Sequence, residues 1–250
     1  MPQIPVALQL YSVRQDAAQD LPTVLRQVKE MGYDGVEFAG YYDRTAAELR
    51  TLLDDTGLQV AGTHAGLKTV LDDELERTIE FNRAIGNTNL IVPGLPPERR
   101  ASIQAWKETA QFFTDLSEKI KAHGMRAGYH NHGHEFQELE GQLPWDVLAQ
   151  NTPSDFILQI DLGNAMHGVP DPVPYLEKYA DRAMTVHVKD RDPNNDKALL
   201  GEGTVRWDDV FRVCEQSGKT EWYIVEQESY AYPPLECVRR CRENLRKMGR

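Results

Sequence analysis

Histidine, aspartate and glutamate residues recur in this 250-residue sequence at the places where short apolar segments end. Six such ends carry Glu37, His64, His130, Asp161, His187 and Glu226. An isolated carboxylate near a core is costly unless it is paired or binds a metal. A converging set of imidazoles and carboxylates therefore indicates a divalent cation site. Because no thiolate belongs to the set, Mn²⁺, Zn²⁺, Co²⁺ or Mg²⁺ is the expected cofactor.

The apolar segments themselves predict the strands that must position these residues. The predicted strands are 5–11, 34–38, 58–64, 88–92, 125–131, 155–161, 183–188 and 222–227. Segments of helical period lie between and after them, at 20–31, 45–56, 72–85, 102–123, 144–151, 171–180, 207–217 and 234–248. In the first of these helices Asp20 is the expected cap and Pro22 lies just inside.

Strict alternation without a linker predicts parallel strands joined by helical crossovers. Eight such units in one chain predict a closed (β/α)8 TIM barrel that forms a single domain over 1–250. The alternative is an open doubly wound sheet, whose dinucleotide-binding members carry a glycine-rich turn after the first strand. The turn at 11–14 contains no glycine. A barrel collects its catalytic groups at the carboxyl ends of the strands, where the ionisable residues stand.

Composition restricts the partners and the compartment. The chain has 28 basic and 39 acidic residues, a net charge of -11, which argues against binding to nucleic acid or to an anionic membrane. Cys214, Cys237 and Cys241 are too few, and odd in number, for a disulfide framework. No signal-peptide pattern or membrane-length apolar run is visible, so we expect a cytoplasmic protein. A monomer and a homo-oligomer are both compatible with the sequence.

Single positions also have simpler interpretations. His64 alone would be a hydrogen-bonded structural histidine, and Asp161 alone would cap the following segment. Glu37 alone would be a buried carboxylate that caps a neighbouring loop. His130 and His132 are two residues apart and share one side of their strand, so one could bind metal while the other faces substrate.

Eight ordered motifs resemble those of a known family. They are LQLYSVR at 8–14, GYDGVEFAG at 32–40, GTHAGL at 62–67, GYHNHGHEF at 128–136, DLGN at 161–164, VHVKD at 186–190, GEG at 201–203 and IVEQE at 224–228. Together they resemble the sugar phosphate isomerase/epimerase family of xylose isomerase-like TIM barrels. This family includes tagatose epimerases, inosose dehydratases and endonuclease IV-type enzymes.

The resemblance implies one divalent metal held by residues from strands five to eight. Asp161, His187 and Glu226 match the family's motifs, but its strand-five glutamate is absent. His130 stands about where that glutamate belongs, and Glu135 is the nearest carboxylate downstream. The fourth ligand is therefore open between these two, and Glu135 is favoured. Asn164 replaces a histidine of the endonuclease IV-type members, which argues against a multinuclear zinc site.

The same departure affects the expected mechanism. Family epimerases are thought to use two glutamates, and here one looks replaced by histidine, so we expect His130 or His132 to transfer protons together with Glu226. The expected activity is metal-dependent isomerisation or epimerisation of a sugar through an enediolate. Glu37, His64 and Lys189 are the expected substrate-binding residues.

Two other functions remain open. A lyase or dehydratase acting on a keto-sugar, keto-glycoside or inosose would use the same proton abstraction. A non-catalytic sugar-binding protein would need no proton transfer.

Overall fold

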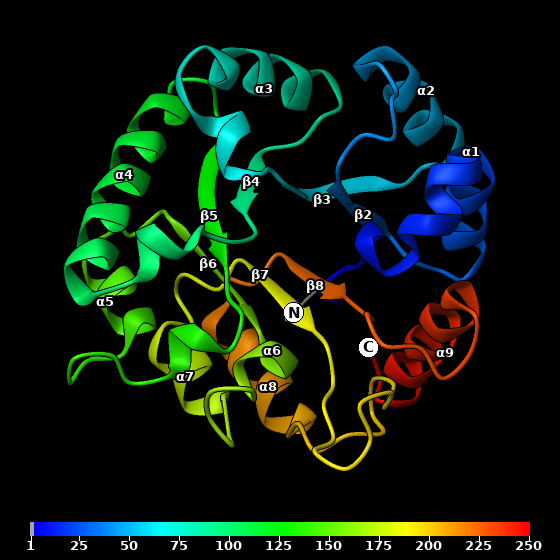
Figure 1. The fold of residues 1–250 in the computed structure, drawn as a ribbon. Coiled ribbons are helices and arrows are strands. Elements are labelled where there is room, and N and C mark those ends of the chain that lie inside the picture. The colour runs from blue at the N-terminus through cyan, green and yellow to red at the C-terminus, as the bar shows by residue number, and fades with distance from the viewer. Residues whose placement is uncertain (1–2) are drawn as a thin grey trace.

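Eight parallel strands close into a barrel in the computed structural model, which describes residues 3–250 (Figure 1). Each strand pairs with the next one in sequence, and the last pairs with the first. The strands are β1 (Val6–Gln9), β2 (Gly35–Ala39), β3 (Gln59–His64), β4 (Asn89–Val92), β5 (Arg126–His130), β6 (Ile157–Asp161), β7 (Thr185–Val188) and β8 (Trp222–Val225). The predicted TIM barrel is thus confirmed, and the open sheet was the wrong alternative.

Helices surround the barrel and lie between consecutive strands (Figure 1). The α-helices are α1 (Arg14–Glu30), α2 (Ala46–Thr56), α3 (Asp72–Ala84), α4 (Ile103–Lys121), α5 (Pro144–Gln150), α6 (Leu162–Ala165), α7 (Val173–Lys178), α8 (Trp207–Ser217) and α9 (Pro234–Lys247). Residues 3–250 also form four short 3-10 helices: η1 (Leu10–Val13), η2 (Leu67–Val70), η3 (Pro97–Arg100) and η4 (His134–Phe136). Helix α6 was not predicted, because four residues are too few to show a helical period.

Helix α1 begins earlier than the predicted range 20–31 and is interrupted inside. Asp20 has φ -150° and ψ 75°, and its Oδ1 accepts a hydrogen bond from the Thr23 N–H at 3.1 Å. Asp20 therefore caps the second part of the helix, as predicted. Pro22 lies in the first turn of this part, where a backbone N–H would have no helical partner and its absence costs nothing. The residues from Arg14 onwards form an additional first part.

Inward-facing side chains fill the barrel in layers because side chains alternate along each strand. A small apolar cluster, separate from the main core, consists of Ala7, Ala61, Trp222 and Ile224. Space inside the barrel is also limited at Gly128 of β5. A Cβ on this residue would lie 2.5 Å from Ile91 Cδ1 and 2.8 Å from Ile157 Cβ. The next inward positions along the strands are polar, and they carry Gln9, Glu37, Gln159 and Thr185.

Strand register brings the ionisable ends together. Asp161 of β6 pairs with His187 of β7, and His130 of β5 pairs with Gln159 of β6. Four consecutive strands thus deliver imidazoles and carboxylates to one end of the barrel, the end where active sites of this fold lie.

Helices α8 and α9 carry the three cysteines. Cys214 of α8 and Cys237 and Cys241 of α9 are buried free thiols. Within residues 3–250, the helices lack the length and apolar character that crossing a bilayer requires.

Candidate active site

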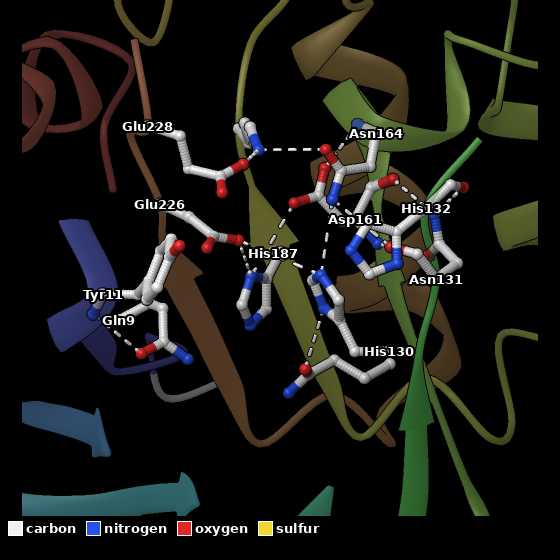
Figure 2. Close-up of polar contacts among 12 residues, drawn as sticks. Gln9, Tyr11, His130, Asn131, His132, Asp161, Asn164, His187, Glu226 and Glu228 are labelled. Carbon is white, nitrogen blue, oxygen red and sulfur yellow. Dashed lines mark hydrogen bonds and ion pairs between the residues drawn. The ribbon is translucent and has the colours of Figure 1, made fainter. Parts of the chain in front are cut away.

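Four side chains converge at the carboxyl end of the barrel: His130, Asp161, His187 and Glu226 (Figure 2). One nitrogen or carboxylate oxygen from each lies within 4.8 Å of all the others. His187 Nδ1 lies 2.9 Å from Glu226 Oε2 and 3.8 Å from Asp161 Oδ2, and His130 Nε2 lies 4.0 Å from Glu226 Oε2. All four residues are at least 95% buried, so the side chains of the cluster are already held close together by the fold.

Asp161 divides its two oxygens between the fold and the cluster. Oδ1 accepts the Asn164 N–H at 2.7 Å and so caps α6, which confirms the simpler interpretation of this residue. Oδ2 is buried and has no hydrogen-bond partner. A buried, unpaired carboxylate oxygen is costly. Burial accordingly raises the pKa of Asp161 to about 7, although the Lys189 ammonium opposes this rise. A divalent cation would satisfy the unpaired oxygen.

Glu37 lies beneath the cluster, and its carboxylate has no exposed surface. Its Oε2 is 2.7 Å from His187 Nε2 and 3.1 Å from His64 Nε2, and both oxygens accept amide N–H groups, from Gln9 and Gln159, at 2.7 Å. Burial alone would raise the pKa of Glu37, but the His64 and His187 rings outweigh burial and hold that pKa far below its usual range. Glu37 was expected to bind substrate, but the structure places its side chain below the cavity, fully buried and in contact with four protein side chains.

Glu135 lies outside the cluster. It is 0% exposed, and Oε1 accepts the Tyr129 hydroxyl at 2.6 Å and lies 3.0 Å from His134 Nε2. Oε2 accepts the His132 backbone N–H at 2.9 Å. The carboxylate therefore holds the loop after β5. Sequence reasoning favoured Glu135 over His130 as the strand-five ligand, whereas the structure places His130, and not Glu135, in the cluster.

A cavity of about 380 Å³ opens above the cluster. Its lining comprises Tyr11, Ala39, His64, Gly66, Pro93, His130, His132, Asn164, Glu226 and Glu228. Lys189 is set behind this wall, where Nζ donates to Asn164 Oδ1 at 2.9 Å and pairs with the Glu228 carboxylate. The volume suits a small polar molecule with several hydroxyl groups.

The pKa values of the histidines in the site are shifted in different directions. Burial lowers the pKa of His130 well below its usual range, and it lowers the pKa of His132 as well. Burial acts in the same direction on His187, but the Glu37 and Glu226 carboxylates outweigh it and raise that pKa to about 10. Burial also opposes the charged form of His64, but the Glu37 carboxylate outweighs burial and raises the pKa of that ring. The two rings that contact Glu37 thus have raised pKa values, whereas those of His130 and His132 are lowered.

The model of the family described as xylose isomerase-like TIM barrel matches residues 25–248. The chain belongs to this family. An inosose dehydratase of Geobacillus kaustophilus is 26% identical over 245 residues, which cover 82% of this chain and 79% of that protein. A sugar phosphate isomerase/epimerase of Parabacteroides distasonis has a similar structure, with a TM-score of 0.84 and 25% identity over 97% of both chains. The family resemblance inferred from the motifs is thereby confirmed.

Another similar structure, that of the IOLI protein, is described with a bound zinc atom. It shares the fold at a TM-score of 0.76 with 13% identity, and the match covers 97% of both chains. At that identity the likeness concerns the fold only.

Sequence reasoning overlooked the amides of this xylose isomerase-like site. Gln159 contacts Glu37, His64 and His130, and Asn164 contacts His130 and Lys189. Gln159 stands two residues before Asp161, so the period of two along β6 placed it on the inward face. The search for ionisable groups passed over it because an amide carries no charge.

Proposed function

We propose that this protein is a divalent-metal-dependent enzyme that removes a proton next to the carbonyl of a keto-sugar or related polyhydroxy ketone. The reaction would proceed through an enediolate and end as isomerisation or epimerisation. The observation that carries this proposal is the buried cluster of His130, Asp161, His187 and Glu226 beneath a cavity of about 380 Å³. Such a cluster at the carboxyl end of a barrel is placed for catalysis rather than for stability.

The four residues of the cluster would hold one metal ion. The unpaired Asp161 Oδ2 supports this assignment, and so does the mixed set of imidazoles and carboxylates without thiolate. When bound, the cation would polarise a carbonyl and offset the negative charge that develops on its oxygen. Mn²⁺, Zn²⁺, Co²⁺ and Mg²⁺ are the candidates, and the zinc described for the IOLI barrel supports Zn²⁺ as the first ion to test.

Residues of the cavity wall would transfer the proton and bind the substrate. His132 lines the cavity, is not needed for the cluster, and is held through its backbone by Glu135, so we assign it as the proton acceptor. Glu226 borders both the cluster and the cavity and would act with it. His64, Asn164 and Glu228 would bind hydroxyl groups, and Lys189 would fix the positions of Asn164 and Glu228.

Elimination is a second candidate because the similarity to inosose dehydratase covers 82% of the chain. The first step would be the same: loss of the proton next to the carbonyl. The enediolate would then expel a group from the adjacent carbon instead of regaining a proton. The leaving group would take a proton from a cavity residue, so that charge is balanced.

The test is to incubate metal-loaded protein with ketoses, inososes and keto-glycosides in D₂O and to follow each by NMR. Isomerisation or epimerisation predicts a new sugar with deuterium at the adjacent carbon, and elimination predicts an unsaturated product. Metal-free protein serves as the control. If sugars bind to the metal-loaded protein but none is converted or exchanged, the protein is a sugar-binding protein and the proposal fails. We also propose that the protein acts in the cytoplasm, which the three buried free thiols support.

A further inference from the structure

Four hydrogen bonds connect Lys189 to Glu37 through His130. Lys189 Nζ lies 2.9 Å from Asn164 Oδ1, and Asn164 Nδ2 lies 3.4 Å from His130 Nε2. His130 Nδ1 lies 3.1 Å from Gln159 Oε1, and Gln159 Nε2 lies 2.7 Å from Glu37 Oε1. Figure 2 shows His130 with interactions at both ring nitrogens. The two ends of this chain have fixed chemistry, and they decide the direction of every bond between them.

Glu37 fixes the lower half of the chain. A carboxylate only accepts hydrogen bonds, so the Gln159 atom that faces it must be the amide nitrogen. The same nitrogen also donates to Thr185 Oγ1 at 2.9 Å. Gln159 Oε1 must then be the atom that faces His130, and a carbonyl oxygen only accepts. His130 therefore carries a proton on Nδ1.

Lys189 fixes the upper half independently. An ammonium group only donates, so the Asn164 atom that faces it must be the carbonyl oxygen. Asn164 Nδ2 must then be the atom that faces His130 Nε2, and it also donates to the Asn131 carbonyl at 3.3 Å. An amide nitrogen only donates, so His130 Nε2 must present a lone pair.

We infer that Gln159 and Asn164 are positioning residues that hold His130 as the tautomer with its proton on Nδ1. The Nε2 lone pair then points toward the side of the ring where Glu226 Oε2 lies 4.0 Å away. The opposite tautomer would set N–H against N–H at Asn164 and lone pair against oxygen at Gln159. The use of this lone pair as a metal ligand rests on the proposed function, whereas the tautomer itself does not.

Because this series of hydrogen bonds is buried, each donor must face an acceptor. His130, Gln159 and Glu37 are 3%, 0% and 0% exposed, so water cannot replace a mispaired hydrogen bond. The geometry also limits the ring to one proton, because the Asn164 amide group offers Nε2 only N–H donors and no acceptor. A metal ligand whose second nitrogen donates to a fixed acceptor is the usual arrangement for histidine.

Histidine tautomers can be read directly in metal-free protein at pH 8. Protein labelled with ¹⁵N in histidine is recorded by long-range ¹H–¹⁵N correlation, and His130 is assigned by the signals lost in His130→Gln. We expect protonated Nδ1 and unprotonated Nε2. Asn164→Asp keeps the side-chain shape but turns an acceptor toward Nε2, so we expect His130 to become protonated on Nε2. Thr185→Val removes the other partner of the Gln159 amide and should leave the wild-type pattern.

Zinc affinity tests the hydrogen bonds that connect His130 Nδ1 to Glu37 through Gln159. Gln159→Met removes the acceptor of His130 Nδ1 and should weaken zinc binding by about 10–100-fold, as loss of an outer hydrogen bond to a ligand typically does. Thr185→Val is again the control and should bind zinc as the wild type does. Thermal unfolding of each variant verifies that it is folded.

The tautomer inference is overturned if wild-type His130 carries its proton on Nε2, or if Asn164→Asp retains the wild-type pattern. Its use in metal binding is overturned if Gln159→Met binds zinc as tightly as the wild type. A correct tautomer and zinc affinity without turnover of any ketone would instead contradict the proposed function. If the enzyme converts a ketone but His130 is the opposite tautomer, the tautomer inference fails and the proposed function stands.

Discussion

His187 is anchored by Glu37, whose Oε2 lies 2.7 Å from His187 Nε2 beneath the cluster. This contact turns His187 Nδ1 toward Glu226 and Asp161, at 2.9 and 3.8 Å. Glu37 is fully buried and has no path to the cavity, so it acts on the site only through the ring that it orients. A carboxylate behind a histidine ligand sets both the orientation and the basicity of the ring.

Glu37→Gln should therefore weaken metal binding without removing a ligand. The amide would place a donor among the donors that now converge on the carboxylate. We expect a loss of metal affinity of about 10–100-fold and a fall in unfolding free energy of roughly 1–3 kcal/mol for each unpaired buried group. Chelator competition and urea unfolding measure the two effects. The matched control is Glu76→Gln on the exposed surface of α3, and equal behaviour of both variants would contradict the role of Glu37.

Asp161 should be required for the metal more than for the fold. Asp161→Asn retains an oxygen that can cap α6 but removes the negative charge, whereas Asp161→Ala removes both. We expect both variants to lose most of their metal and activity, and only the alanine variant to lose about 1 kcal/mol from the missing cap. Metal content by mass spectrometry and thermal unfolding check these outcomes. Retention of one metal per chain in Asp161→Ala would refute the assignment.

We expect the contribution of Glu135 to the free energy of unfolding to depend on pH. Burial alone would raise the pKa of its carboxyl, but the nearby His134 ring and the hydrogen bond from Tyr129 outweigh burial and lower that pKa below the ordinary 4.5. A lowered pKa in the folded state adds stability above the unfolded-state pKa, and this stability is lost as the pH falls through the folded-state pKa. Glu135→Gln should thus be destabilised by roughly 1–3 kcal/mol at pH 7.

The difference between Glu135→Gln and wild type should narrow as the pH falls below 4.5. Urea unfolding across this pH range measures it. A constant difference at all pH values would show that the carboxylate charge does not stabilise the loop.

The barrel and the cluster were predictable for the same reason. Alternation of apolar strands and helices identified the fold, and strand ends that carry Asp161 and His187 become neighbours through strand register. The depth of each side chain within the barrel was harder to predict. Glu37 is the central residue of β2 and is followed by Phe38 and Ala39, so it lies below the rim of the barrel. The direction of the loop after β5 depends on tertiary contacts of Glu135 with Tyr129, which no local pattern encodes.

The three cysteines should be inert in the folded protein. Cys214 is 1% exposed, and Cys237 and Cys241 are 0% exposed. Burial raises the pKa of Cys214 to about 11 and that of Cys241 to about 12, so little reactive thiolate forms near pH 8. We expect no thiol titration by Ellman's reagent in native protein and three thiols per chain in guanidinium chloride. Rapid native labelling would show that α8 or α9 opens readily.

Proton transfer provides the last prediction, and it depends on the proposed roles of His132 and Glu226. Acid–base groups typically contribute about a hundred- to ten-thousand-fold to a rate, so His132→Ala and Glu226→Gln should each slow conversion by at least about a hundredfold. His123→Ala, in the exposed turn after α4, is the matched control. The loss should appear in kcat more than in KM, because the groups act on the reacting proton and leave most substrate contacts in place. Failure to exchange deuterium from D₂O would not decide the matter, since a shielded base can return the same proton. A substrate deuterated next to its carbonyl decides it: full activity in both variants, with no primary isotope effect on a step limited by chemistry, would exclude proton abstraction by this site.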